Sequence, residues 1–409
     1  LNCYQKHDRN ITPYGQKVED NLLPELFEKV LKDSDYQSRR KEIDAFNRKS
    51  KSQLRGLALT ACKFGISFTS KFLNQGNALV NIHRDGTIQA STGATEMGQG
   101  VNTKIAQIIA YEFGLTPKKV QILATSTDRN ANTSPTAASS GFDINGAAAL
   151  LACEKIKFRM AQVAKYYFTQ NPRPPIAPPL EEIKVTEFNS AEEFHSFEVE
   201  FKDEKVIYKG EAMSWVDLVL LTYYNRISIS DYSHFKTRGL TFDRTRSYGD
   251  AFKYFTPGVA VSEVSIDAYT GETKILRCDI LMDIGRPMNI GIDMGQVTGG
   301  FIQGTGWMTT EKLFYSKEGA LISHSPTTYK IPNIQDTPRI FNVSLLENNL
   351  NKKSVARAKA VGEPPILLSA SVFMAIKNAI SYRTRNELVE LNVPATPEAI
   401  LLELNRHEL

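Results

Sequence analysis

Cysteine is scarce in this sequence, and the few cysteines are not spaced to bind a metal. None of the four belongs to a CxxC pair, which argues against a zinc site or an iron–sulfur cluster built by local spacing. We expect buried, reduced thiols, as in a cytoplasmic protein. The four are Cys3, Cys62, Cys153 and Cys278.

A membrane-spanning run, a secretory signal and a strong net charge are also missing. No apolar run reaches the roughly 20 residues that cross a bilayer, and the N-terminus lacks a charged stretch followed by an apolar one. The formal charge of +4 is the difference between 49 basic and 45 acidic residues, which does not favour binding to nucleic acid. We therefore expect a cytoplasmic protein with neither membrane nor nucleic acid as a partner. Because the first residue is Leu1 rather than Met, we also expect the chain to belong to a longer polypeptide.

The composition is that of a soluble protein with a sizeable core, since 42% of the residues are hydrophobic and 23% are charged. Residues 1–55 are polar and rich in charge, which predicts a connecting segment of solvated helix and loop. Residues 56–409 are predicted to form one domain. Within it, residues 172–208 contain several prolines and then many acidic residues, and they are expected to leave the core as an excursion, in the form of a surface hairpin.

Hydrophobic periodicity and turn residues predict the main elements of this domain. Apolar and polar residues alternate on both sides of Asp85-Gly86, which indicates a hairpin with a two-residue turn. Gly114 is placed to end an amphipathic helix. Hairpins and helices without regular βαβ alternation indicate the α+β class, with mixed hairpin sheets and packed helices. The expected strands are at residues 80–82, 88–90, 259–267 and 273–282, and the expected helices are at 101–113, 142–167 and after Pro364-Pro365.

The first motif that bears on chemistry is the glycine-rich stretch at residues 93–100, which joins a predicted strand to a predicted helix. Backbone N–H groups at a helix N-terminus form a natural site for an anionic group. Gln99 and Gly100 stand where the phosphate loop of nucleotide hydrolases needs Lys and then Ser or Thr, so that chemistry is disfavoured. A glycine turn that only leads into a helix would show the same pattern.

Three further motifs follow, and each also has a purely structural explanation. Small residues at 133–141 expose backbone amides to a ligand, but they are also typical of a linker. The glycines at 295–304 fit a cofactor contact or a closely packed helix. At residues 360–365 two prolines hold Glu363 rigidly ahead of a helix, as a general base would require. A glutamate that faces water at a helix start is the alternative.

Taken together and in this order, the four motifs resemble the molybdenum hydroxylases, the family of xanthine dehydrogenases and aldehyde oxidases. The resemblance extends from the first residues to about residue 398. The stretches at 63–69, 72–76 and 133–139 are similar to the xanthine dehydrogenase branch. The resemblance implies that this chain is the C-terminal half of the molybdenum-cofactor-binding domain of such an enzyme.

The resemblance also implies roles for individual residues. Glu363 matches the catalytic base, and Phe68 with Thr69 matches part of the substrate site, where an aromatic ring stacks on a flat heterocycle. Gln99 matches a residue beside the oxo ligand of molybdenum. The implied residues of the molybdopterin site are Met97, Gly98, Gln99, Gly100, Ala138, Ser139 and Gln296.

No protein ligand to the metal is implied, because the family holds molybdenum through its pterin. Gly141 departs from the family, in which a serine near the pterin is frequent. The other half of the domain, which supplies further substrate-orienting residues, is not in this sequence. FAD and [2Fe-2S] clusters are expected on partner domains or subunits, and a homo-oligomer is expected for the full enzyme.

The function implied is hydroxylation of a purine, from hypoxanthine or xanthine to urate, within a larger enzyme of which this chain alone is inactive. One alternative is a hydroxylase of an aldehyde or another N-heterocycle. A non-catalytic module for cofactor binding or assembly is the other.

Overall fold

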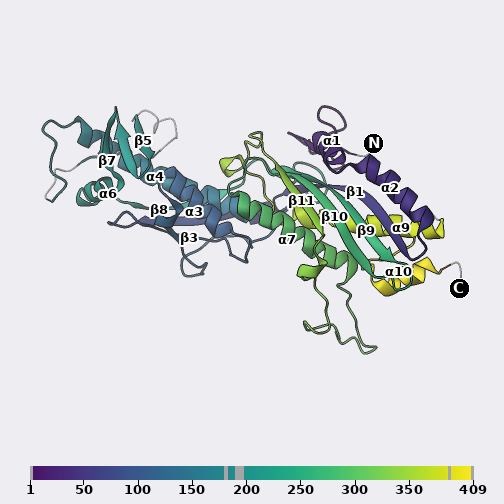
Figure 1. The fold of residues 1–409 in the computed structure, drawn as a ribbon. Helices are drawn as coiled ribbons and strands as arrows, with labels where there is room; N and C mark the ends of the chain where they lie inside the picture. The colour runs from purple at the N-terminus through teal and green to yellow at the C-terminus, as the bar shows by residue number, and fades with distance from the viewer. Residues whose placement is uncertain (1–2, 179–182, 189–197, 386–387, 407–409) are drawn as a thin grey trace.

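The chain forms two lobes because a long segment is inserted between two paired strands. The computed structural model describes residues 3–178, 183–188, 198–385 and 388–406. Strand β1 (Gln53–Ile66) pairs antiparallel with β9 (Tyr254–Asp267) along its whole length, with Ile66 opposite Tyr254. Residues 67–253, between these strands, form what we call the inserted lobe, and the rest forms the outer lobe. Figure 1 shows the inserted lobe at the left and the outer lobe at the right.

The inserted lobe packs helices against a four-stranded sheet of order β4-β3-β2-β8 and a three-stranded sheet of order β5-β6-β7. Its strands are β2 (Gln75–Ile82), β3 (Ile88–Thr92), β4 (Val120–Ile122), β5 (Val199–Lys202), β6 (Lys205–Tyr208), β7 (Glu211–Ser214) and β8 (Ser230–Lys236). Its helices are α3 (Val101–Glu112), α4 (Gly141–Thr169) and α6 (Trp215–Tyr224).

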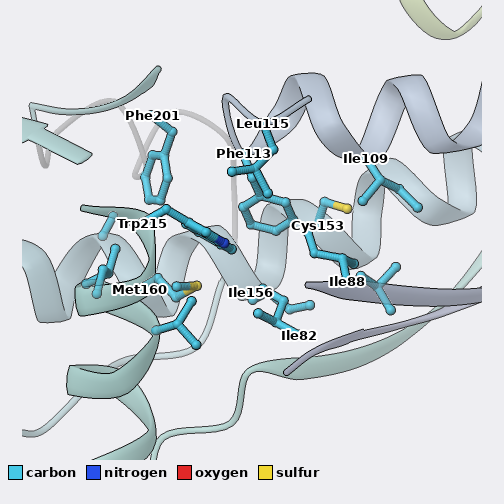
Figure 2. Packing of buried hydrophobic residues seen from close by; sticks show 14 of the residues in the cluster. Ile82, Ile88, Ile109, Phe113, Leu115, Cys153, Ile156, Met160, Phe201 and Trp215 are labelled. Atoms are coloured by element: carbon cyan, nitrogen blue, oxygen red, sulfur yellow. The ribbon is translucent and has the colours of Figure 1, made fainter. Parts of the chain in front are cut away.

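One hydrophobic core holds this lobe together. Figure 2 shows Trp215 of α6 beside Phe113 and Phe201, with α4 contributing Cys153 and Met160. The Trp215 indole N–H donates to the carbonyl oxygen of Gly86 at 2.8 Å, which satisfies its one polar atom inside the core. Full burial of a large apolar side chain contributes about 1.5–3 kcal/mol to stability, so this cluster accounts for much of the lobe's cohesion.

The expected helices and hairpins of the inserted lobe are confirmed, with one change in a turn. Strands β2 and β3 form the first hairpin, but His83 N–H donates to the Thr87 oxygen, so three residues rather than two close it. Gly86 takes a φ of +81° there, as the last residue of such a turn requires. Gly114, at φ +63°, ends α3 as expected.

The excursion expected at residues 172–208 lies partly outside the described residues, namely at 179–182 and 189–197. Its described end contains the hairpin β5–β6. Alternate side chains of that hairpin, Val199, Phe201, Val206 and Tyr208, are buried in the core of the lobe. The hairpin is therefore a packed element, because one of its faces is apolar.

The outer lobe is built on a sheet of order β1-β9-β10-β11, with helices on both faces. Val259 and Val261 of β9 face α1 and α2, whereas Ala260 and Val264 face the C-terminal helices. A strand covered on both faces is apolar on both faces. Figure 1 shows α1 and α2 on one side of the strands and α7 and α10 on the other. The other elements are α1 (Leu23–Asp33), α2 (Tyr36–Lys49), β10 (Thr273–Asp283), α7 (Ile290–Thr309), β11 (Ile340–Leu346), α8 (Pro364–Leu368), α9 (Ala370–Thr384) and α10 (Pro397–Leu404).

Most of residues 23–49, within the expected connecting segment, is helical as predicted, but these helices are not simply solvated. Helices α1 and α2 pack on the sheet, and Arg39 of α2 is buried. Its guanidinium lies 2.7 Å from a Glu263 oxygen and 3.0 Å from an Asp279 oxygen. The polar composition of this segment suggested full exposure to solvent, because only a narrow stripe of α2 touches the sheet. The domain boundary predicted at residue 56 stays a prediction.

The helix expected after Pro364-Pro365 is confirmed, although Ser369 divides it into α8 and α9. By length and composition alone, the stretch Pro364–Thr384 would suffice to cross a membrane. Half of its most apolar part is buried inside the protein, where α9 packs against β1 and β9. These contacts make it the core helix of the outer lobe.

Candidate functional site

A cavity of about 370 Å³ lies where the two lobes meet, and all four sequence motifs contribute to its wall. The inserted lobe supplies the glycine-rich stretch and the small-residue loop, and the outer lobe supplies α7 and the segment before α8. A volume in this range is typical of a small-molecule site. Of the predicted site residues, those that line the cavity are Met97, Gln99, Ser139, Gln296 and Glu363. Gly98, Gly100 and Ala138 are their immediate neighbours.

The backbone of the glycine-rich stretch is bonded to its own side chains. The Glu96 carboxylate accepts hydrogen bonds from the N–H groups of Gly98 and Gly100, both at 2.9 Å, and of Asn102 at 3.0 Å. Partial burial alone would raise the pKa of Glu96, but these N–H donors hold it below its ordinary value. The amides that the sequence predicted to be open to an anion are thus already paired with Glu96, which sequence reasoning missed.

The Gln99 side chain also stabilises this loop through hydrogen bonds to its backbone. Its side-chain amide donates to the Thr95 oxygen at 2.8 Å and accepts from Met97 N–H at 2.5 Å. Gly98 has a φ of +99°, and a methyl group added there would meet nothing within 4 Å. The loop therefore combines a fixed shape with open space at Gly98, as close approach of a ligand to backbone requires.

The small-residue loop connects the two lobes through Ser139. Ala138 and Ser139 both adopt left-handed backbone conformations, at φ +53° and +52°. Such conformations are costly for residues other than glycine and are concentrated at functional sites. The Ser139 hydroxyl donates to Oε2 of Glu363 at 2.8 Å and accepts from Glu363 N–H at 2.9 Å. Glu363 is exposed, so its carboxylate is held at the rim of the cavity and not within the core.

Two buried ion pairs stand at the cavity wall. Lys359, four residues before Glu363, contacts Oδ2 of Asp283 at 2.5 Å, and both side chains are at least 96% buried. Lys104 of α3 pairs with Asp293 of α7, which ties the glycine-rich stretch to the helix that carries Gln296. Removing one partner of such a pair leaves a buried charge and is strongly destabilising.

Asp143, in the first turn of α4, is a buried carboxylate close to the cavity. Oδ2 of Asp143 accepts a hydrogen bond from the Tyr254 hydroxyl at 2.6 Å. Burial raises the pKa of Asp143 to about 6, while the Tyr254 hydrogen bond and the charges of Lys253 and Lys104 act in the opposite direction. Sequence reasoning did not single out either residue of this pair.

We expect Asp143→Asn to change how stability depends on pH. Folding takes up a proton on Asp143 between pH 4 and 6, because the pKa rises from 3.8 to about 6. Its contribution to the free energy of unfolding is therefore largest below pH 4 and falls by up to about 3 kcal/mol as the pH rises past 6. Urea unfolding should be measured from pH 4 to 8. The free energy of unfolding of the wild type minus that of the variant should fall between pH 4 and 6. Asp243→Asn is the control, because the pKa of exposed Asp243 is lowered by Thr245 and its contribution has the opposite sign.

Phe68 and Thr69, the predicted substrate residues, do not line this cavity. Phe68 is half-buried and Thr69 is exposed. The Asn74 side chain accepts from Phe68 N–H at 2.8 Å and donates to its oxygen at 2.9 Å, which fixes the backbone there. Their role in substrate binding stays a prediction.

The cysteines lie in the protein interior as free thiols, with Cys62, Cys153 and Cys278 buried and Cys3 partly buried. Burial raises the pKa of the Cys62 thiol to about 12. Within the described ranges, no group of three or more His, Cys, Asp or Glu side chains is placed to hold a metal ion.

Sequence comparison finds the same kind of domain over most of the chain. The model of the molybdopterin cofactor-binding domain matches residues 29–338. Xanthine dehydrogenase/oxidase of Felis catus is 40% identical over 406 residues, which cover 98% of this chain and 27% of that protein. Xanthine dehydrogenase 1 of Arabidopsis thaliana is 38% identical over 402 residues, covering 96% of this chain and 26% of that protein. The chain thus spans about a quarter of the length of these relatives.

Solved structures share the fold at low sequence identity. The Cu,Mo-CO dehydrogenase superposes with a TM-score of 0.77 at 18% identity, over 97% of this chain and 47% of that one. Quinoline 2-oxidoreductase of Pseudomonas putida 86 gives a TM-score of 0.76 at 20% identity, with the same coverage of both chains. The α+β architecture with mixed sheets is the one expected from the sequence.

Proposed function

The chain belongs to the molybdopterin cofactor-binding domain family, and from this premise we propose that it is part of a larger molybdenum hydroxylase that acts on hypoxanthine or xanthine. One observation carries the proposal: the cavity brings Glu363 and Ser139 together with Gln99 and Gln296 from four separate segments. The similarity to xanthine dehydrogenases over 98% of the chain supports the choice of a purine. We further propose that the full enzyme is a cytoplasmic homo-oligomer.

The residues of the cavity fit part of a molybdopterin. A pterin is a flat ring with hydrogen-bonding edges, and the wall offers the side-chain amide of Gln296, the loop fixed by Gln99, and open space beside Gly98. We assign cofactor binding to Met97, Gly98, Gln99, Gly100, Ala138, Ser139 and Gln296. When bound there, the molybdenum cofactor would provide the redox chemistry of the hydroxylation, and FAD and [2Fe-2S] groups on partner domains would provide the route for the electrons.

Glu363 is assigned the proton transfer. Ser139 occupies Oε2, so we assign Oε1 as the atom that takes up the proton. The bond from Glu363 N–H to the same hydroxyl fixes the backbone as well as the side chain. A base held by two hydrogen bonds needs little reorganisation before it accepts a proton, which is what general-base catalysis requires.

Steady-state turnover of xanthine, hypoxanthine and benzaldehyde by the complete polypeptide tests this proposal. We expect kcat/KM to be at least about 100-fold higher for the purines, because a site built to hydrogen-bond its substrate rejects an analogue that lacks those groups. The 409-residue chain alone is expected to turn over none of them. Preference for benzaldehyde would identify an aldehyde hydroxylase instead, and no turnover by a fully loaded enzyme would favour an assembly module.

A further inference from the structure

The segment that leads to Glu363 is anchored at Ala360 by side chains of β9. The N–H of Ala360 donates to the Tyr254 hydroxyl at 3.0 Å, and its oxygen accepts from the Thr256 hydroxyl at 3.0 Å. Tyr254 and Thr256 are two residues apart on one strand, so both point to the same face of the sheet. Both backbone polar groups of Ala360, which belong to the two peptide units on either side of its Cα, are thus hydrogen-bonded to β9, three residues before Glu363.

The chain of hydrogen bonds continues into the inserted lobe. The Tyr254 hydroxyl accepts from Ala360 and donates to Oδ2 of Asp143 at 2.6 Å. Tyr254 and Asp143 are 7% and 5% exposed, so water does not compete strongly for these bonds. Tyr254 is also the residue opposite Ile66 at the end of the β1–β9 ladder, where the two lobes join.

The start of α4 therefore holds both ends of the segment 360–363. Ser139, two residues before α4, bonds to Glu363, and Asp143, in its first turn, reaches Ala360 through Tyr254. A segment fixed at both ends by one rigid helix keeps a constant distance between Glu363 and the loop that lines the cavity.

From this arrangement we infer that Asp143 and Tyr254 are positioning residues, which place Glu363 for proton transfer without contacting the substrate. The inference rests on the proposed role of Glu363 as the base. Tyr254 is suited to the task because its hydroxyl both accepts and donates, so it can join a backbone amide of one lobe to a carboxylate of the other.

The test replaces Tyr254 by phenylalanine in the complete, cofactor-loaded enzyme. Tyr254→Phe keeps the buried ring and removes both hydrogen bonds of the hydroxyl. We expect kcat to fall about 10- to 100-fold, since small misplacement of a reacting group has effects of this order. KM and molybdenum content should stay unchanged. Amide hydrogen exchange should become faster at residues 358–362.

Tyr382→Phe is the matched control. Tyr382 of α9 also donates to a carboxylate, that of Asp44 in α2, but it lies away from the cavity lining. Tyr382 is half-buried, so its loss should lower stability by less than that of buried Tyr254, and it should leave both kcat and exchange at 358–362 unchanged.

The outcomes separate the positioning role from the proposed function. Faster exchange at 358–362 together with a lower kcat supports the positioning role. Wild-type kcat for Tyr254→Phe, measured beside an inactive Glu363→Gln enzyme, overturns it, and so does unchanged exchange at 358–362. Full activity of Glu363→Gln would instead overturn the assignment of the base, whatever Tyr254→Phe shows.

Discussion

Glu363→Gln is expected to lower kcat of the complete enzyme by about 100- to 10,000-fold, the usual contribution of a general base. Glutamine has the shape of glutamate and still offers Ser139 an acceptor oxygen, so the hydrogen bonds that hold residue 363 can persist. An amide, however, does not take up a proton at neutral pH. Because Glu363 is exposed at the cavity rim, its neutralisation should leave folding and cofactor content intact.

Three measurements on the same preparation check this expectation: kcat for xanthine, molybdenum per polypeptide, and Tm. Glu398→Gln is the control, since Glu398 is an exposed glutamate whose contact with Lys312 is 3.4 Å. It should behave as wild type. Retention of more than roughly a tenth of kcat by fully loaded Glu363→Gln enzyme would show that Glu363 is not the base.

Lys359→Met is expected to lower the free energy of unfolding by about 3–5 kcal/mol, the usual effect of breaking a buried ion pair. Asp283 has no solvent exposure, and Lys359 is 6% exposed. Methionine fills most of the volume of the lysine side chain but leaves the Asp283 carboxylate without its cation. Hydrogen bonds to Asp283 from Gly285 N–H and the Asn348 side chain remain, but they do not neutralise its charge.

Urea unfolding measures this loss, with Lys29→Met as the control. Lys29 and Asp33 form an exposed pair at 2.9 Å, and such pairs contribute about 0–1 kcal/mol. Adding Asp283→Asn to Lys359→Met should restore part of the stability, because the unpaired charge is then removed. A loss of under about 1 kcal/mol for Lys359→Met would contradict the buried geometry.

The features that could be predicted from the sequence are those with a local cause. Helix α3 follows from a periodic apolar stripe and the glycine that ends it, and the start of α8 follows from the two prolines in its first turn. Glu363, however, keeps a helical backbone ahead of these prolines and is held by Ser139, which the prolines did not predict. The four motifs were each ambiguous alone, and their order pointed to one family. In the structure they share one cavity.

The features that could not be predicted depend on partners far apart in sequence. Asp143 and Tyr254 are 111 residues apart, and Arg39 is 224 residues from Glu263. A tyrosine in an apolar strand has the same sequence pattern whether its hydroxyl is bonded or not. Glu96 was missed for a different reason, because a carboxylate beside glycines looks like a solvated residue until its donors are seen.

Insertion of one lobe between β1 and β9 also has a consequence for the order of folding. Pairing of β1 with β9 must close a loop of all residues from 67 to 253, and the entropy of closure grows with the length of an unfolded loop. A folded inserted lobe removes most of that cost, because it already brings residues 66 and 254 together. Contacts between residues far apart in sequence slow folding, and β1–β9 pairing is of this kind. The slowing should be smaller here, because the inserted lobe has its own core and can fold first. We therefore expect the cavity, whose walls come from both lobes, to be completed only after both lobes have formed.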